Sequence, residues 1–249
     1  MMLDDKVAII YGAGGAIGGA IAKAFAAQGA RVHLTGRTRA SLEKVAAEIR
    51  EQGGQAETAE VDAMDETAVD EHAAAVGTFD ISVNVTATYD VQGIPMVEMS
   101  VDDYLAPVTL PVRSRFITSR AAARHMIPRR SGVILFFGGE GDRSVHRRYR
   151  LGGLVTGFVA VEAMRRQLAG ELGEYGIRVV TLQTSGIAES LPADMPGREE
   201  LAAQLAAPSP LDRTATLADV GNAAVFAASD WAASVTGAAI NITCGAFMD

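Results

Sequence analysis

The sequence predicts a single α/β domain over residues 1–249, built on a doubly wound parallel sheet of seven strands. Three observations predict this fold class. Short apolar segments alternate with alanine-rich segments in which apolar residues recur at helical spacing. A glycine-rich turn joins the first apolar segment to the first helical pattern. Finally, no linker rich in proline or serine divides the chain into domains.

Seven segments are expected to form the strands, and about six helices lie between them. The predicted strands are residues 6–11, 30–36, 55–61, 79–85, 132–138, 177–183 and 238–243. The first predicted helix illustrates the helical pattern: Ile17, Ile21 and Phe25 recur at the spacing of one helical face. Apolar strands that alternate with helices form parallel sheets that are covered on both faces.

Two long segments interrupt this alternation. Residues 86–100 form a predicted loop that ends at Ser100, a residue type that caps helix N-termini. Residues 184–216 contain several prolines and a short helical pattern at 198–207. Because both segments follow strands, both are expected at the carboxyl edge of the sheet, where open α/β folds bind ligands.

The composition excludes several classes of partner. The formal net charge of −8 argues against nucleic acid or an anionic membrane surface, and no apolar segment is long enough to span a bilayer. Cys244 is the single cysteine, which suits a reducing compartment, so the expected location is cytoplasmic. The four histidines are scattered, and no metal site is predicted. A small-molecule substrate is the expected partner.

The turn YGAGGAIGG, residues 11–19, lies between the first predicted strand and the first predicted helix. Glycines at such a turn let the backbone approach a pyrophosphate, and the free N–H groups of the helix N-terminus bind it. The alternative is a glycine-rich turn without a ligand. The candidate cofactor-binding residues here are Gly12, Gly14, Gly15, Ile17 and Gly18.

The ends of the next strands indicate which dinucleotide is bound. The second strand ends in LTGR, with Arg37 near the place where an acidic residue would bind the ribose of NAD. A guanidinium suits the 2′-phosphate of NADP, so NADP(H) is expected rather than NAD(H). A solvated arginine at a helix start is the alternative. Asp62 could accept a hydrogen bond from the adenine amino group, and the remaining cofactor-binding candidates are Ala63, Asn84 and Val85.

These features, in this order, resemble the short-chain dehydrogenase/reductase family, whose sheet is Rossmann-like, and the resemblance covers nearly the whole chain. The turn is similar to the family pattern T-G-x-x-x-G-x-G, and Asp62 matches the family's adenine-contacting aspartate. Other similar segments are NVTA at 84–87, RAAARHM at 120–126, LAGELGEYGIRV at 168–179 and VTGAAIN at 235–241.

The resemblance implies a dinucleotide-binding half at about 1–90 and a substrate and oligomer half at about 91–249. It also implies a homodimer or homotetramer that pairs through two long helices, expected at about 111–127 and 153–175. Prolines 107 and 111 are expected to start or kink the first of these helices.

The family's catalytic residues are a serine, a tyrosine and a lysine in Y-x-x-x-K, and an asparagine. Tyrosine protonates the developing alkoxide, lysine lowers the pKa of that tyrosine, and serine orients the carbonyl. At the corresponding positions this sequence has Pro111 for asparagine, Gly138 and Gly139 for a serine pair, Leu154 for tyrosine and Phe158 for lysine. Lysines occur only at 6, 23 and 44, so no other alignment restores the motif.

Two further segments have alternative interpretations. An apolar stripe is predicted along one helix at Leu154, Phe158, Val161, Met164, Leu168 and Leu172. It could pack in the core or between subunits, or Leu154 and Phe158 could line an apolar pocket beside the nicotinamide position. Residues 140–150 are rich in arginine and form either a solvated loop or a clamp for a carboxylate, phosphate or coenzyme A group. His146 and Tyr149 are weak candidate proton donors there, and weaker candidates elsewhere are Tyr89, Asp90 and Glu189.

Three functions remain open at this level, because a fold does not determine a function. The first is an atypical NADP(H)-dependent oxidoreductase that acts on a small carbonyl or enone without the tyrosine–lysine relay. The second is a non-redox enzyme on the same scaffold, such as a cyclase, dehydratase or isomerase. The third is a non-catalytic protein that binds the cofactor or takes part in an assembly.

Overall fold

The computed structural model describes residues 1–86, 89–139 and 150–248. Within these residues, seven parallel strands form one sheet in the order β3-β2-β1-β4-β5-β6-β7. The strands are β1 (Val7–Tyr11), β2 (Arg31–Gly36), β3 (Gln55–Glu60), β4 (Ile81–Asn84), β5 (Gly132–Gly138), β6 (Ile177–Gln183) and β7 (Ala239–Asn241). The strand order reverses between β1 and β4, which makes this point of the sheet the expected ligand-binding crevice. The predicted fold class is confirmed.

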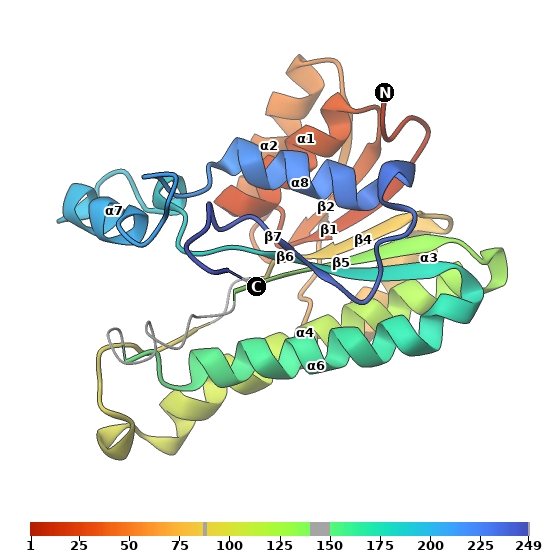
Figure 1. The fold of residues 1–249 in the computed structure, drawn as a ribbon. Coiled ribbons are helices and arrows are strands. Elements are labelled where there is room, and N and C mark those ends of the chain that lie inside the picture. The colour runs from red at the N-terminus through yellow and green to blue at the C-terminus, as the bar shows by residue number, and fades with distance from the viewer. Residues whose placement is uncertain (87–88, 140–149, 249) are drawn as a thin grey trace.

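Helices cover both faces of the sheet, as Figure 1 shows. One face carries α1 (Ala16–Ala27), α2 (Arg39–Glu51) and α8 (Leu217–Ala228), and the other carries α3 (Glu66–Val76), α4 (Val101–Met126) and α6 (Gly153–Leu172). The helix α7 (Arg198–Ala206) lies beyond the carboxyl ends of the strands. Short 3-10 helices are η1 (Met96–Glu98), η2 (Ile127–Arg129), η3 (Gly173–Tyr175), η4 (Ala188–Ser190) and η5 (Asp230–Ala232).

Each face of the sheet has its own apolar core. Ile10 and Leu34 pack beneath α1, α2 and α8, whereas Ile9 and Phe136 pack beneath α3, α4 and α6. Successive strand residues point to opposite faces, so a strand buried on both sides is apolar throughout. This is why the central strands appear in the sequence as continuous apolar segments.

The helix α4 begins about ten residues earlier than the sequence analysis predicts. Ser100 is its N-cap, and the Ser100 hydroxyl accepts a hydrogen bond from the backbone N–H of Asp103. Pro107 and Pro111 therefore lie inside the helix, and neither of them starts it. The N-cap expected at Ser100 is confirmed, whereas the helix start expected at about residue 111 was wrong, because this cap, with acidic residues in the first turn, allows the helix to form before the prolines.

The predicted apolar stripe on α6 also needs correction. The buried face of this helix consists of Gly153, Gly157, Val161, Arg165, Ala169 and Leu172. Val161 and Leu172 belong to both sets, and Met164 and Leu168 are half-buried and pack against the same core, as expected. Leu154 and Phe158 are half-buried beside this face. The reason is a close helix crossing: a Cβ on Gly157 would lie 2.0 Å from the carbonyl oxygen of Pro107. Glycine is required where the α6 backbone touches α4.

Candidate functional site

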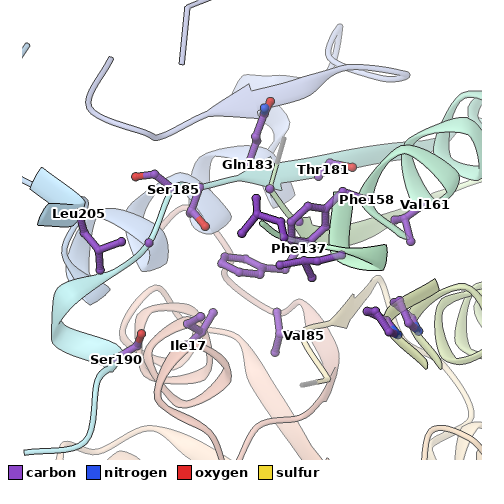
Figure 2. Close-up of a pocket in the computed structure, with 18 of the residues that line it drawn as sticks. Ile17, Val85, Phe137, Phe158, Val161, Thr181, Gln183, Ser185, Ser190 and Leu205 are labelled. Carbon is purple, nitrogen blue, oxygen red and sulfur yellow. The ribbon is translucent and has the colours of Figure 1, made fainter. Parts of the chain in front are cut away.

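A cavity of about 600 Å³ opens at the carboxyl edge of the sheet. Its walls come from the glycine-rich turn, the ends of β5 and β6, the first turns of α6, and α7 (Figure 2). Both long segments predicted on the ligand side contribute to it, the first through Thr86 and Gln92 and the second through Ser185 and Leu205. These expected positions are confirmed.

The glycine-rich turn brings α1 to one end of the cavity. Gly12 has a φ of +88°, and a Cβ there would lie 2.9 Å from the carbonyl carbon of Val85. A Cβ on Gly18 would lie 2.3 Å from the carbonyl oxygen of Gly12, so both positions require glycine. Gly15 is the N-cap of α1 and lines the cavity with Ile17 and Gly18. The first N–H groups of a helix have no intrahelical acceptor, so this turn presents donors suited to an anion.

The remaining predicted cofactor residues lie at the ends of neighbouring strands. Arg37 and Asp62 are exposed, each just after the end of its strand, and Asp62 Oδ1 accepts a hydrogen bond of 3.0 Å from the N–H of Met64. Gly14 lies close against α2, and a Cβ at this position would lie 2.4 Å from Ser41 Oγ. Ala63 is buried directly after Asp62.

Asn84 is fully buried and connects three segments. Its Nδ2 donates to Thr118 Oγ1 on α4 at 3.0 Å, while its Oδ1 accepts from the N–H and the hydroxyl of Thr86 at 3.1 and 2.8 Å. Val85 then lines the cavity, and its N–H donates to the carbonyl of Tyr11 at 3.0 Å. Asn84 thus ties the chain after β4 to α4, and the N–H of Val85 ties it to the end of β1.

The middle of the cavity is apolar. Phe137 and Phe158 line it, and Figure 2 shows Ile17 and Val85 on the opposite side of the cavity. A Cβ on Gly139 would lie 3.3 Å from Phe158 Cε2 and 3.1 Å from the carbonyl oxygen of Thr184, so the absence of a side chain there makes room for the ring. All five residues predicted at the family's catalytic positions line this one cavity: Pro111, Gly138, Gly139, Leu154 and Phe158.

The inner end of the cavity is polar and carries ionised groups that the sequence analysis missed. Arg115 of α4 donates from Nη2 to the carbonyl of Phe137 at 2.6 Å. Glu162 of α6 accepts from Arg165 Nε at 2.9 Å and from the hydroxyl of Thr181. Arg115, Glu162 and Thr181 line the cavity. Arg115 follows Pro111 by four residues and so lies on the same helical face, which is the signal that could have revealed it.

Arg115 is almost completely buried, with 5% of its surface exposed. Burial lowers the pKa of its guanidinium to about 10, and the negative charge of Glu162 opposes that shift. The group therefore remains a cation at neutral pH.

Other predicted candidates lie elsewhere. The carboxylate of Glu189 accepts from the N–H of Leu217 at 2.7 Å and so caps α8. The side chain of Asp90 accepts from Gln92 Nε2, and Tyr89 is exposed. His146 and Tyr149 lie outside the described residues, as do arginines 143, 147 and 148. The described part of the chain contains no cluster of histidine, cysteine, aspartate and glutamate that could hold a metal ion, and none of its helices is long and apolar enough to cross a membrane.

The sequence profile of the family described as enoyl-(acyl carrier protein) reductase matches residues 12–246. The chain belongs to the short-chain dehydrogenase/reductase family. Members of this family of oxidoreductases act on small molecules, and its dehydrogenases use nicotinamide cofactors. The glycine-rich turn fits such a cofactor, because the start of α1 at Gly15, Ile17 and Gly18 lines the cavity and its first N–H groups have no intrahelical acceptor.

Curated relatives of this short-chain dehydrogenase/reductase include dehydrogenases of similar length. Galactitol 2-dehydrogenase (L-tagatose-forming) of Cereibacter sphaeroides is 31% identical over 98% of this chain and 95% of the relative. The 2,3-dihydro-2,3-dihydroxybenzoate dehydrogenase of Bacillus subtilis is 30% identical over 94% and 93%. A solved short-chain type dehydrogenase/reductase from Mycobacterium marinum has a TM-score of 0.87 and 25% identity, over 99% of this chain and 97% of that one.

Proposed function

We propose that this chain is an atypical NADP(H)-dependent oxidoreductase that acts on a small carbonyl or enone compound without the tyrosine–lysine relay of its family. One observation carries the proposal: the glycine-rich turn at one end and the apolar chamber around Phe137 and Phe158 in the middle line the same cavity. A dinucleotide held at the turn would therefore extend toward the place where an apolar substrate fits.

The cofactor would be held by the residues at the strand ends. The N–H groups around Gly15, Ile17 and Gly18 suit the diphosphate, Asp62 suits the adenine amino group, and Arg37 suits a 2′-phosphate because it is exposed and permanently charged. When bound, the nicotinamide supplies or accepts a hydride.

The chamber would orient the substrate and exclude water. The resemblance puts Leu154 at the tyrosine position and Phe158 at the lysine position, and neither can hand over a proton. A serine at position 139 would crowd the ring of Phe158. Glycine at the serine position and phenylalanine at the lysine position therefore fit each other. A missing general acid costs about 10²–10⁴-fold in rate. Slow turnover is therefore expected unless another group or water supplies the proton.

A titration tests the cofactor half of the proposal. Wild-type protein is expected to bind NADPH at least tenfold more tightly than NADH, measured by calorimetry, and Arg37→Ala is expected to remove most of that preference. Arg31→Ala is the matched control, because Arg31 is exposed at the other end of β2. Equal affinity for the two coenzymes would contradict the NADP assignment, and binding of neither would contradict the whole proposal.

A turnover assay tests the redox half. Loss of NADPH absorbance is followed with a panel of carbonyls and enones, and the organic products are identified by mass spectrometry. Substrate conversion without cofactor oxidation would instead assign the chain to the non-redox class of cyclases, dehydratases and isomerases. Cofactor binding without any conversion would assign it to the non-catalytic class.

A further inference from the structure

We propose that the inner end of the cavity recognises an anionic group, and that Arg115 binds the carboxylate of a substrate with an apolar body. This inference deepens the proposed function and rests on it in one respect only, namely that the cavity is the substrate site. It names a substrate class, hydrophobic carboxylic acids, and a residue that selects it.

The balance of charge at the inner end is the first observation. Arg165 forms an ion pair with Glu162, with Nε and Nη2 at 2.9 and 2.8 Å from Oε2, while Oε1 accepts from the hydroxyl of Thr181. The negative charge of Glu162 is thereby balanced by Arg165, and both of its oxygens accept hydrogen bonds. Arg115 makes its hydrogen bonds to backbone carbonyls, those of Phe137 at 2.6 Å and Pro111 at 3.5 Å. The cluster of these three ionised groups therefore carries one uncompensated positive charge.

Burial makes this charge costly. A buried ion is stable only when an opposite charge and a full set of hydrogen bonds compensate for lost hydration. Within the described residues, Arg115 has no ion-pair partner and its Nε has no hydrogen-bond partner. A ligand carboxylate at this end would supply the missing charge.

Support for the β5 carbonyl does not by itself require a cation. The pairing of β4 with β5 ends at Asn84 and Phe136. The carbonyl of the next residue, Phe137, accepts a hydrogen bond from a side chain instead of from β4. A neutral amide could supply that donor without the cost of a buried charge. The position of Arg115 on the cavity wall explains why a charged residue stands there.

The walls between the turn and Arg115 define the rest of the ligand. Phe137, Leu154, Phe158 and Val161 line this stretch, so the body of the ligand is apolar, and Figure 2 shows Val161 and Thr181 at the end next to α6. A hydrophobic acid would place its carboxylate among the polar groups and its apolar part against the aromatic rings.

The test compares two ligands of nearly the same shape, the charged 4-phenylbutyrate and the neutral 4-phenylbutanamide, on cofactor-free protein by calorimetry at pH 7. Wild-type protein is expected to bind the carboxylate at least tenfold more tightly than the amide. Arg115→Gln keeps a donor for the carbonyl of Phe137 and is expected to reduce this preference to less than threefold. Arg115→Lys keeps the positive charge and is expected to retain part of the preference for the carboxylate.

Arg178→Met is the matched control. Arg178 also bonds backbone carbonyls from a partly buried position, those of Ala227, Ser229 and Val235, but on the side of α8 and β7. The control is expected to keep the wild-type preference even if its melting temperature falls.

The wild-type comparison alone decides the proposal if the Arg115 variants do not fold. Equal affinity of the wild-type protein for the two ligands, no binding of the carboxylate, or an unchanged preference in folded Arg115→Gln would each overturn it. Because no cofactor is added, the result is separate from the proposed function. Binding of NADPH together with failure to bind the carboxylate would reject this inference alone.

Discussion

Phe158 and Gly139 show at the scale of single residues how one side chain depends on the absence of another. The ring of Phe158 occupies space that a Cβ at position 139 would enter. The two residues come from different elements, α6 and the end of β5, so their fit is a tertiary contact. Changing one of them alone is therefore expected to leave the wall of the cavity either overfilled or open.

Gly139→Ser is expected to lower the free energy of unfolding by about 1–3 kcal/mol, the range for overpacking a filled site. The new Cβ would lie 3.3 Å from the ring of Phe158 and 3.1 Å from the carbonyl oxygen of Thr184. Urea unfolding monitored by circular dichroism measures the change. Gly138→Ser is the control, because its Cβ would make only an ordinary contact of 3.6 Å with Thr181. An equal loss in both variants would show that the ring of Phe158 is not the constraint.

The crossing of α4 and α6 is the most demanding contact between elements. A Cβ on Gly153 would lie 1.9 Å from the carbonyl oxygen of Tyr104, and one on Gly157 would lie 2.0 Å from that of Pro107. Backbones this close bring the first turns of α6 against α4. Leu154 and Phe158, the neighbours of these glycines, consequently lie at the cavity instead of in the crossing.

Gly157→Ala is expected to destabilise the protein by about 1–3 kcal/mol or more, since α6 must move away from α4 to admit a methyl group. Gly170→Ala lies on the same helix and its Cβ would meet nothing within 4 Å, so it is expected to stabilise by up to about 1 kcal/mol through helix propensity. Thermal and urea unfolding of both variants check the pair. The changes in the free energy of unfolding must have opposite signs in the two variants. A stabilising Gly157→Ala would refute the close crossing.

Much of the architecture of these elements could be predicted from the sequence, because alternating apolar segments and glycine turns have local causes. Every predicted strand is present, with ends that differ by no more than a few residues. The α6 stripe could not be predicted correctly, since Gly153 and Gly157 contribute no hydrophobicity to the pattern that marks a buried face. Arg115 was missed for a related reason: an arginine in a helical sequence is ordinarily solvated, and only tertiary packing buries it.

At the scale of the whole molecule, α4 and α6 each expose a large apolar side chain. Phe116 of α4 and Val159 of α6 are 49% and 50% exposed. These are the two helices through which the family resemblance implies pairing. A second copy of the chain would remove such side chains from water, at a gain of about 25 cal/mol for each Å² of apolar surface.

Light scattering is expected to show a homodimer or homotetramer. A double variant, Phe116→Asp with Val159→Asp, is expected to shift the mass toward the monomer. The two new carboxylates would lose their hydration in the interface between subunits, and this cost opposes association. Val97→Asp is the control, since Val97 is 95% exposed on η1. A monomeric wild-type protein would refute this prediction.

The helix α7 contributes Leu201, Gln204 and Leu205 to the cavity, yet none of its residues is fully buried. This part of the cavity wall and the two apolar cores are thus formed by different parts of the chain. Exchange of these three side chains can alter the size and shape of the molecules admitted while the two cores keep their packing. Under the proposed function, new substrate preferences would arise by substitution at these three positions with little penalty in stability.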